Sequence, residues 1–330
     1  MNIKYLAIIP LLIISNLSEA ACTRDGSGDI DLTDQANMVT DPGRAGAGNQ
    51  CSEIPDFYKV TFYKIAVCTE NPYNSTNNFS SCKYILNDDS GVPNVMTYPN
   101  SAPLETGEFR IPSGSYGYAL LILDNQIYLK HTETFDLDVY GYSSSIEDTD
   151  AKGKACWTNS QKTTIDNFVG TLNWVTTTET AGSDQRKIGL VCGAIANAAP
   201  VYAAEIIDNL CHDADGECGD TVGTDNDGKF HAIEQADDID STQTGGTRNV
   251  KLLKTDETTA TSRNNARKIA YSIAFTDPLQ VDAESARFNI AFNLSGSVSI
   301  DFAYTDVDGS DEIMIQKVGA DMFTAIFTLE

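Results

Sequence analysis

The sequence predicts an all-β protein built from one or two antiparallel β-sandwich domains, and three observations support this fold class. Ser115 to Leu123 is apolar on both faces of an extended chain, as in the central strand of a covered sheet. Phe57 to Cys68 is rich in aromatic and β-branched residues, which favour strands. From Phe288 to Tyr304 apolar and polar residues alternate, as in a strand with one buried face.

The stretch from Ser115 to Leu123 is the element around which we expect the core to be arranged. A strand that is apolar on both faces must be covered on both sides, so it belongs in the middle of a sheet. Asp124 and Asn125 interrupt the apolar run, which resumes from Ile127 to Lys130. This pattern predicts a hairpin with a polar turn. A buried helix is the alternative, although nearby glycines and tyrosines favour a strand.

Other strands are expected before and after this central one. Phe57 to Cys68 is its predicted neighbour, and Lys83 to Leu86 begins a shorter strand. Prolines at 93, 99 and 103 indicate an extended surface connection from Asn87 to Glu108. Helix competes with strand only at Val201 to Leu210, where Ala and Glu accompany two Ile residues. The later predicted strands are Phe168–Thr176, Ile188–Ile195, Val201–Leu210, Val250–Leu253 and Ile269–Phe275.

The C-terminal part has the clearest alternation in the chain. Its apolar positions share one parity, which predicts a buried face, and its polar positions share the other, which predicts a solvent-exposed face. The pattern indicates either one long half-exposed strand or a hairpin bent at Gly296. Strands at Glu312 to Val318 and Met322 to Leu329 follow. The apolar set is Phe288, Ile290, Phe292, Leu294, Val298, Ile300, Phe302 and Tyr304.

The first twenty residues resemble a secretory signal peptide. They carry Lys4, an apolar run from Tyr5 to Ile14 and a small residue, Ala20, at the expected cleavage site. Few large apolar groups follow, so the next segment is expected to be irregular. The predicted organisation is a signal peptide at 1–20, an irregular acidic and Gly-rich N-terminal arm at 21–56, a β-sandwich domain at 57–180, and a second β-rich domain at 187–330 with a long acidic loop at 211–246.

The signal peptide predicts an exported protein that is secreted or held at the cell surface, or periplasmic if the cell is Gram-negative and retains it. No later run reaches the ~18 apolar residues that span a bilayer, so no transmembrane anchor is expected. The formal net charge is −25. Nucleic acid is therefore an unsuitable partner, because its phosphates repel an acidic chain. The acidic surface suits solubility or cation binding.

An even number of cysteines in an exported chain predicts disulfides. A zinc or thiol redox site has little support, since no CxxC motif occurs and the chain has three histidines. Neighbours in the sequence suggest the pairing. The expected bridges are Cys22 with Cys51, Cys68 with Cys82, Cys156 with Cys192, and Cys211 with Cys218.

Two Asp- and Gly-rich stretches fit part of an EF-hand calcium loop, in which oxygen ligands alternate around a central glycine. With Gly228 as that glycine, Asp225, Asp227 and Glu234 occupy ligand positions, and only the first position, Gly223, fails. The stretch from Thr23 to Asp34 is a less complete copy. A solvated Asp–Gly turn is the alternative for both. Three more acidic residues could complete the first calcium site: Asp213, Asp215 and Asp220.

The segment IPSGSYGYALLIL, from Ile111 to Leu123, resembles the turn and following strand of prealbumin-like β-sandwich modules. That group includes transthyretin-like and collagen-adhesin B-type repeats. The resemblance covers a short part of the 330 residues and implies a sandwich fold. It implies no particular activity, because such modules serve as stalks, adhesins and enzyme appendages.

No catalytic motif supports an enzyme. The sequence lacks a Gly-x-Ser-x-Gly elbow, a His-Glu-x-x-His motif and a phosphate-binding glycine loop. His131, His212 and His231 are expected at surface or turn positions. Paired carboxylates for glycoside cleavage stay open, since the chain has 47 acidic residues. Aromatic residues in polar stretches that could stack on sugars are Tyr73, Tyr98, Tyr140, Tyr142 and Trp157.

These observations predict an exported, non-enzymatic cell-surface structural protein, such as a filament, coat or adhesin subunit, stabilised by calcium. The alternative is a secreted carbohydrate-binding or carbohydrate-active protein. The expected partners are surface glycans and other copies of the chain. Asp321 to Leu329, or the arm from Ala21 to Gln50, would complete the sheet of a neighbouring subunit by strand exchange. In the opposing hypothesis both ends fold back onto their own sandwich.

Overall fold

The computed structural model describes residues 21–32, 50–73, 77–97, 111–141, 152–166, 171–173, 186–207, 221–222, 229–230, 233–234, 248–261, 265–282, 288–307, 310–320 and 323–329. In this part of the chain the protein is all-β, with antiparallel sheets and one short 3₁₀ helix, η3 (Ile195–Asn197). The predicted fold class is confirmed. No helix among these residues has the length and apolar character needed to cross a membrane.

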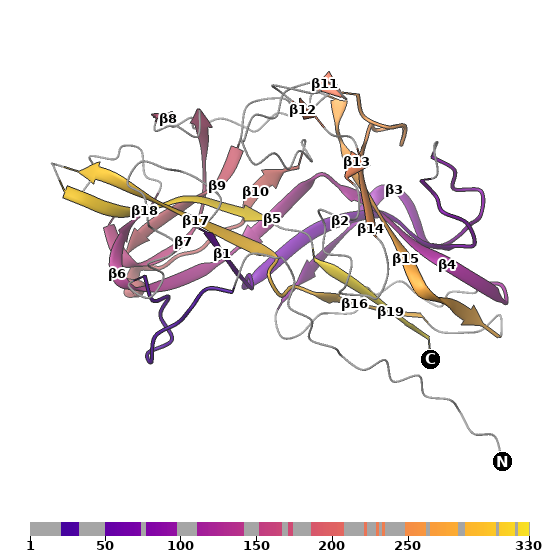
Figure 1. Ribbon diagram of the computed structural model, residues 1–330, viewed down its shortest axis with the longest axis horizontal. Coiled ribbons are helices and arrows are strands. Elements are labelled where there is room, and N and C mark those ends of the chain that lie inside the picture. The colour runs from indigo at the N-terminus through magenta and orange to yellow at the C-terminus, as the bar shows by residue number, and fades with distance from the viewer. Residues whose placement is uncertain are drawn as a thin grey trace, which may run out of the picture.

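The larger sheet has the strand order β10–β5–β2–β4–β15–β14–β13, and β3 pairs with β2 (Figure 1). As predicted, β4 is central, because it lies between β2 and β15 and is buried on both faces from Ala119 to Leu123. Its strands are β2 (Phe57–Cys68), β3 (Cys82–Met96), β4 (Gly114–Asp124), β5 (Gln126–Lys130), β10 (Ala203–Ile206), β13 (Ile233–Glu234), β14 (Arg248–Leu253) and β15 (Lys268–Val281).

The hairpin predicted at Asp124 and Asn125 is wrong, because the chain does not turn back there. β4 and β5 pair with successive parts of β2 in the same antiparallel sense, so they form two halves of one long strand. This long strand pairs with β2 along one edge. Along its other edge the partner changes at Asn125, from β15 beside β4 to β10 beside β5. The Asn125 N–H donates to the carbonyl of Arg267, next to β15, and its carbonyl accepts the N–H of Ile207, next to β10. Asn125 is buried, so these bonds satisfy polar groups that would otherwise be unpaired.

β3 also departs from the prediction. It continues from Cys82 to Met96 through Pro93, where a surface connection was expected. Pro93 lies opposite Thr61 of β2, and β2 is the neighbour with which β3 pairs in the described sheet. A proline, which has no N–H to donate, is tolerated on an edge strand.

The second large sheet has the order β1–β17–β18–β6–β7–β8. β6 and β9 lie on opposite edges of β7, and each also forms a bridge with β18. This sheet therefore curls back on itself. Its strands are β1 (Gln50–Glu53), β6 (Thr132–Tyr140), β7 (Lys152–Asp166), β8 (Thr171–Asn173), β9 (Arg186–Gly193), β17 (Val298–Val307) and β18 (Ser310–Ala320). Both large sheets combine strands from residues 57–180 with strands from residues 187–330.

A long C-terminal hairpin belongs to the second sheet at one end and packs on the larger sheet at the other. β16 (Phe288–Asn293) pairs with β19 (Thr324–Leu329), and β17 pairs with β18 in a register that continues the first pairing (Figure 1). Gly296, with φ of +70°, bends the chain between β16 and β17 without turning it back. Of the two alternatives, one long strand describes this segment better than a hairpin bent at Gly296 does. The small remaining pair is β11 (Thr221–Val222) with β12 (Lys229–Phe230).

The apolar parity predicted for this hairpin is confirmed, since Ile290, Phe292, Leu294, Val298, Ile300 and Phe302 are buried. The opposite parity is not uniformly exposed. Ser297 and Ser299 are buried as well, and Ser299 pairs with Ser52 of β1. Sequence alternation assigned these two serines to solvent, so their burial was not predicted.

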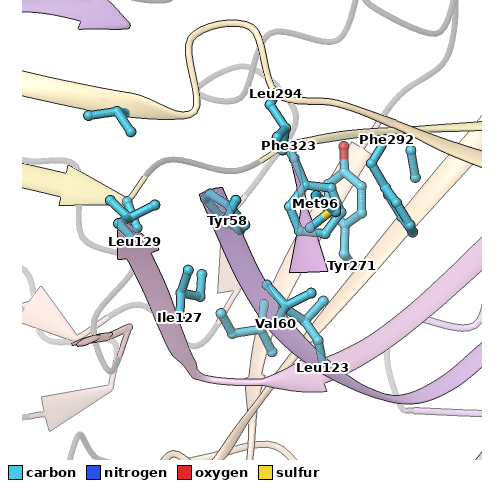
Figure 2. Close-up of a cluster of buried hydrophobic side chains, with 14 of the residues drawn as sticks. Tyr58, Val60, Met96, Leu123, Ile127, Leu129, Tyr271, Phe292, Leu294 and Phe323 are labelled. Carbon is cyan, nitrogen blue, oxygen red and sulfur yellow. The ribbon is translucent and has the colours of Figure 1, made fainter. Parts of the chain in front are cut away.

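The main core lies between the larger sheet and the C-terminal hairpin and extends into the second sheet. Figure 2 shows its centre, where side chains from β2, β4, β5 and β15 meet residues of the hairpin. Phe62 of β2 stacks on Phe292, with ring centroids 5.2 Å apart, and Phe323 packs edge-on against Tyr58, Phe62 and Phe292. Such aromatic pairs add to the stability that burial of their apolar area provides.

Three disulfides cross-link the fold: Cys22–Cys51, Cys68–Cys82 and Cys156–Cys192. They match three of the four pairs predicted from sequence neighbours. Two of them join residues that lie directly opposite each other on adjacent strands, β2 with β3 and β7 with β9. Cys211 and Cys218 lie outside the described residues. Multiple disulfides indicate an oxidising, extracytoplasmic environment.

Candidate functional site

A group of half-buried and buried polar side chains lies on the face of the larger sheet opposite the main core. The register places Lys64, Ile122, Ala270 and Lys251 in one row across β2, β4, β15 and β14. Apolar neighbours on this face form a second, smaller core that includes the Cys68–Cys82 bridge. Small and aliphatic side chains thus hold the flanking lysines in fixed positions on the sheet.

We call the charged group on this face the lysine cluster, and it consists of Lys64, Lys251, Lys268, Glu257 and Asn77. The Glu257 carboxylate pairs with the ammonium groups of Lys64 and Lys268, the latter at 3.1 Å. Lys251 Nζ donates to Asn77 Oδ1 at 2.9 Å, and Asn77 Nδ2 donates to the Glu257 carbonyl at 3.1 Å. The cluster therefore fastens the connection between β2 and β3 and the turn after β14 onto the sheet.

Glu257 has an unusual backbone conformation, with φ of 65°. A residue other than glycine is rare in this region, and the conformation carries strain. The turn is closed by the Glu257 N–H, which donates to the Lys254 carbonyl at 3.0 Å, and by the Lys254 N–H, which donates to the Thr258 carbonyl at 2.8 Å. The two ion pairs of the Glu257 carboxylate help to offset the strain.

Aromatic rings cover the ammonium groups of the lysine cluster. Lys268 Nζ lies 4.2 Å from the ring centre of Tyr63, and Lys251 Nζ lies 5.0 Å from that of Tyr73. Burial lowers the pKa of Lys251. Burial and the Asp124 carboxylate raise the pKa of Tyr63 to about 12, and burial together with Glu257 raises the pKa of Tyr73 well above 10.0. Both tyrosines are therefore neutral at physiological pH.

A second group on the same sheet is more accessible. We call it the lysine–aromatic strip, and it consists of Phe57, Lys59, Tyr128, Lys130 and Tyr202. Phe57 lies opposite Lys130 and Lys59 lies opposite Tyr128 across β2 and β5, so lysines and aromatic rings alternate in both directions. Lys59 Nζ is 5.0 Å from the Tyr128 ring centre, and Lys130 Nζ is 4.9 Å from that of Phe57. Tyr202 is 37% exposed and packs edge-on against Phe57.

A third charged group fastens the N-terminal arm. Arg24 forms two hydrogen bonds with the Glu133 carboxylate, at 2.8 and 2.9 Å, and an ion pair with Glu53 at 2.9 Å. His131 is buried beside them, with Nε2 3.4 Å from Glu133 Oε2, so the surface or turn position predicted for it is wrong. The arm is further held by buried Ile30, which bridges to Phe135.

The predicted calcium site lies largely outside the described residues, which omit Asp213, Asp215, Asp220, Asp225 and Asp227. Glu234 is described, and lies in β13 opposite Val250. The described part of the chain contains no group of three or more His, Cys, Asp or Glu residues that could hold a metal. The calcium site therefore stays a prediction.

The second calcium frame, from Thr23 to Asp34, is described up to residue 32. Asp25 Oδ1 accepts hydrogen bonds from the N–H groups of Ser27 and Asp29, at 2.7 and 3.0 Å. This carboxylate oxygen closes a turn, and Gly28, with φ of +92°, supplies the left-handed position. The geometry favours the Asp–Gly turn over a metal loop at this position.

Three of the aromatic residues predicted to stack on sugars are described, and none of these three is exposed. Tyr140 and Trp157 are buried in β6 and β7, and the Tyr73 hydroxyl is buried inside the lysine cluster. Tyr98, Tyr142, His212 and His231 lie outside the described residues.

The lysine–aromatic strip was not predicted, although the sequence contains a signal for it, since each of Phe57 and Tyr128 precedes a lysine by two positions. Residues two apart on a strand share a face.

The wider comparisons add no further assignment to this geometry. The antiparallel all-β architecture agrees with the prealbumin-like resemblance at the level of fold class. Comparison of the chain with protein-family models, curated proteins and solved structures gave no match.

Proposed function

We propose that this chain is an exported, non-enzymatic structural protein of the cell surface, of the filament, coat or adhesin kind. The observation that carries the proposal is the fastening of both ends of the described chain. Cys22–Cys51 and Arg24 tie the N-terminal arm to the second sheet, and the C-terminal hairpin forms part of the second sheet and packs against the larger one. A module held at both ends in this way suits a protein that bears load outside the cell.

Two further features support this proposal. The three disulfides suit an oxidising location, and the net charge of −25 keeps an exposed surface soluble. The prealbumin-like resemblance around Ile111 to Leu123 belongs to a group that includes adhesin repeats, and we extend it to this chain as part of the proposal.

Cell fractionation tests this function. Antibodies raised against the mature protein should label intact cells, and mechanical shearing should release most of the protein with other surface material. Recovery in the cytoplasm, or only in the culture medium without any surface labelling, would contradict a structural role at the cell surface.

The second candidate is a secreted carbohydrate-binding protein, and the lysine–aromatic strip is the observation that favours it. Aromatic rings at the surface can stack on sugar rings, and the strip presents them beside cationic groups on a pleated sheet. Retention of the purified protein on immobilised polysaccharide, with elution by the free polysaccharide, would support this candidate. Passage of the protein through all such columns would contradict it.

A further inference from the structure

We infer that the lysine–aromatic strip binds acidic sugar units, either uronic acids or sulfated sugars, with the lysines as partners of the anionic groups and the aromatic rings as partners of the sugar rings. This inference rests on the second proposed function and names its ligand class. The strip consists of Phe57, Lys59, Tyr128, Lys130 and Tyr202.

The alternation of the strip suits a chain of sugars in which apolar and anionic parts recur. Phe57 and Lys59 share one face of β2, and Tyr128 and Lys130 share the same face of β5. The two cross-strand pairs are Phe57 with Lys130 and Lys59 with Tyr128. Side chains directly opposite on antiparallel strands are ~5 Å apart, so two cations and two rings lie within the length of a short oligosaccharide.

The ammonium groups of the strip are available to an anion. No described carboxylate forms an ion pair with Lys59 or Lys130, whereas Lys64 and Lys268 are already paired with Glu257. A lysine ammonium has three N–H donors, and contact with a ring face leaves donors free for a carboxylate or sulfate. Glu257 thus pairs with two lysines of the lysine cluster, whereas no described carboxylate pairs with the two lysines of the strip.

A negatively charged ligand is compatible with the overall acidity of the chain. The net charge of −25 is spread over the whole protein. Salt at physiological strength limits each charge to a range of ~8 Å, so local cations decide what the strip attracts. Tyr202 adds a third ring, because Lys59 Nζ also lies 5.9 Å from its ring centre.

A sugar fits the strip better than a protein partner does. A standard protein–protein interface uses ~20–30 residues on each side. The strip has five side chains, which match a ligand of a few rings. An acidic peptide thus becomes the competing outcome of the test.

The experiment measures binding of the full mature protein to dextran sulfate, unsulfated dextran, polygalacturonate and polyglutamate by calorimetry at physiological salt. A double variant, Lys59→Gln with Lys130→Gln, removes the two cations, and Tyr128→Ala removes a ring. Lys152→Gln is the matched control, because Lys152 Nζ lies 5.0 Å from the Tyr140 ring on the other large sheet. Melting curves of all variants verify that each is folded before binding is compared.

We expect dextran sulfate and polygalacturonate to bind, and the double variant to bind each at least about tenfold more weakly, because charge-assisted hydrogen bonds are lost. Tyr128→Ala should weaken binding as well, while Lys152→Gln should bind like the natural protein. Equal weakening in Lys152→Gln, or none in the double variant, would overturn the assignment to the strip. Polyglutamate binding as tightly as the acidic sugars would make the partner an acidic peptide and overturn it too.

Binding of unsulfated dextran, the neutral polymer, distinguishes failure of this inference from failure of the carbohydrate-binding function. If unsulfated dextran binds as tightly as dextran sulfate, the carbohydrate-binding function stands and the acidic ligand class is wrong. If none of the three polysaccharides binds, both the function and the inference fail.

Discussion

Arg24 of the N-terminal arm holds Glu133 of β6 through both carboxylate oxygens, at 2.8 and 2.9 Å. The same guanidinium reaches Glu53 of β1 at 2.9 Å, so one cation joins the arm to two strands of the second sheet. A planar guanidinium suits such paired contacts, because its donors match the two oxygens of a carboxylate. The arm, which has few apolar residues, is thus positioned by a charge and a disulfide.

Replacement of Arg24 by alanine should destabilise the protein by about 2 kcal/mol, because two carboxylates would then lie together without their cation. Loss of one partner of a fully buried pair costs ~3–5 kcal/mol, and the value is lower here since the Arg24 side chain is 35% exposed. Chemical denaturation would measure the change. Lys83→Ala, at an exposed position of β3, is the control. Equal loss of stability in both variants would contradict a specific role for Arg24.

The same group predicts how stability depends on pH. Burial raises the pKa of Glu133, but its interactions with His131 and Arg24 outweigh burial, and the net pKa lies below 4.5. A lowered pKa stabilises the folded state above the ordinary value, and this stabilisation is lost as the pH falls through the folded-state pKa. Glu133→Gln should therefore lose less of its remaining stability on acidification below 4.5 than the natural protein does.

The pKa of Glu53 is shifted in the opposite direction to that of Glu133, so a Glu53 variant serves as the comparison. Burial and the neighbouring Glu133 raise its pKa above 4.5. Protonated Glu53 therefore stabilises the folded state at low pH, and this stabilisation is lost as the pH rises through the folded-state pKa. Over that rise in pH the Glu53→Gln variant should lose less stability than the natural protein does. Urea denaturation between about pH 3 and about pH 7 would measure both variants. Parallel stability curves for the two would refute this account.

The Cys68–Cys82 bridge should contribute about 3 kcal/mol, as expected for a closed loop with a sequence separation of 14. It also closes the connection that carries Tyr73 and Asn77 onto Lys251. A Cys68→Ala, Cys82→Ala variant should therefore melt at a lower temperature and lose the protection of that connection from proteolysis. Thiol titration of the unfolded, unreduced natural protein should detect none of the six bridged cysteines. An unchanged melting temperature would contradict this role.

The sequence predicted the strands that are apolar on both faces or strictly alternating, since burial follows directly from those patterns. β4 and the C-terminal hairpin are examples. It missed the extent of β3, because tolerance of Pro93 depends on which strand lies at an edge. It also missed the continuity of β4 with β5. That depends on the hydrogen bond that Asn125 donates to Arg267 and the one that it accepts from Ile207, and both partners are distant in the sequence.

The candidate sites were harder to predict than the fold. Lys64, Lys251 and Lys268 come together only through the register of four strands, and Glu257 reaches them through a turn with positive φ. The pairing of Arg24 with Glu133 spans 109 residues. No local spacing encodes these distances, whereas three disulfides between sequence neighbours could be predicted from order alone.

Calcium should raise the melting temperature if the stretch from Gly223 to Glu234 binds it, because a ligand held only by the folded state stabilises that state. A chelator should lower the melting temperature and added calcium should restore it. The variant Asp227→Ala with Glu234→Ala should lose this response, while Asp25→Ala should keep it, since Asp25 Oδ1 is used by backbone N–H groups. Identical melting of the natural protein with and without chelator would leave only the solvated turn.

We predict that assembly would depend on the C-terminal strand, β19. In the described chain β19 pairs with β16 of the same molecule, and Phe323 just before it is 1% exposed among Tyr58, Phe62 and Phe292. Strand exchange stays a prediction, and it would use this same pairing between two copies of the chain. Phe323→Ala should cost ~3–5 kcal/mol in either case, because a buried ring is replaced by a cavity.

Truncation after Ala320 separates exchange from folding within one molecule. The truncated protein lacks β19 and should be strongly destabilised, because β16 and the rings around Phe323 lose their cover. If the strand can be supplied by another chain, a synthetic peptide of residues 321–330 should bind the truncated protein and restore its melting temperature, and the full-length protein should form oligomers that grow with concentration in sedimentation. A control peptide with Phe323 replaced by Ser should restore less. Monomers at every concentration, together with a truncated protein that the peptide does not rescue, would rule out exchange, because β19 would then act only within its own chain.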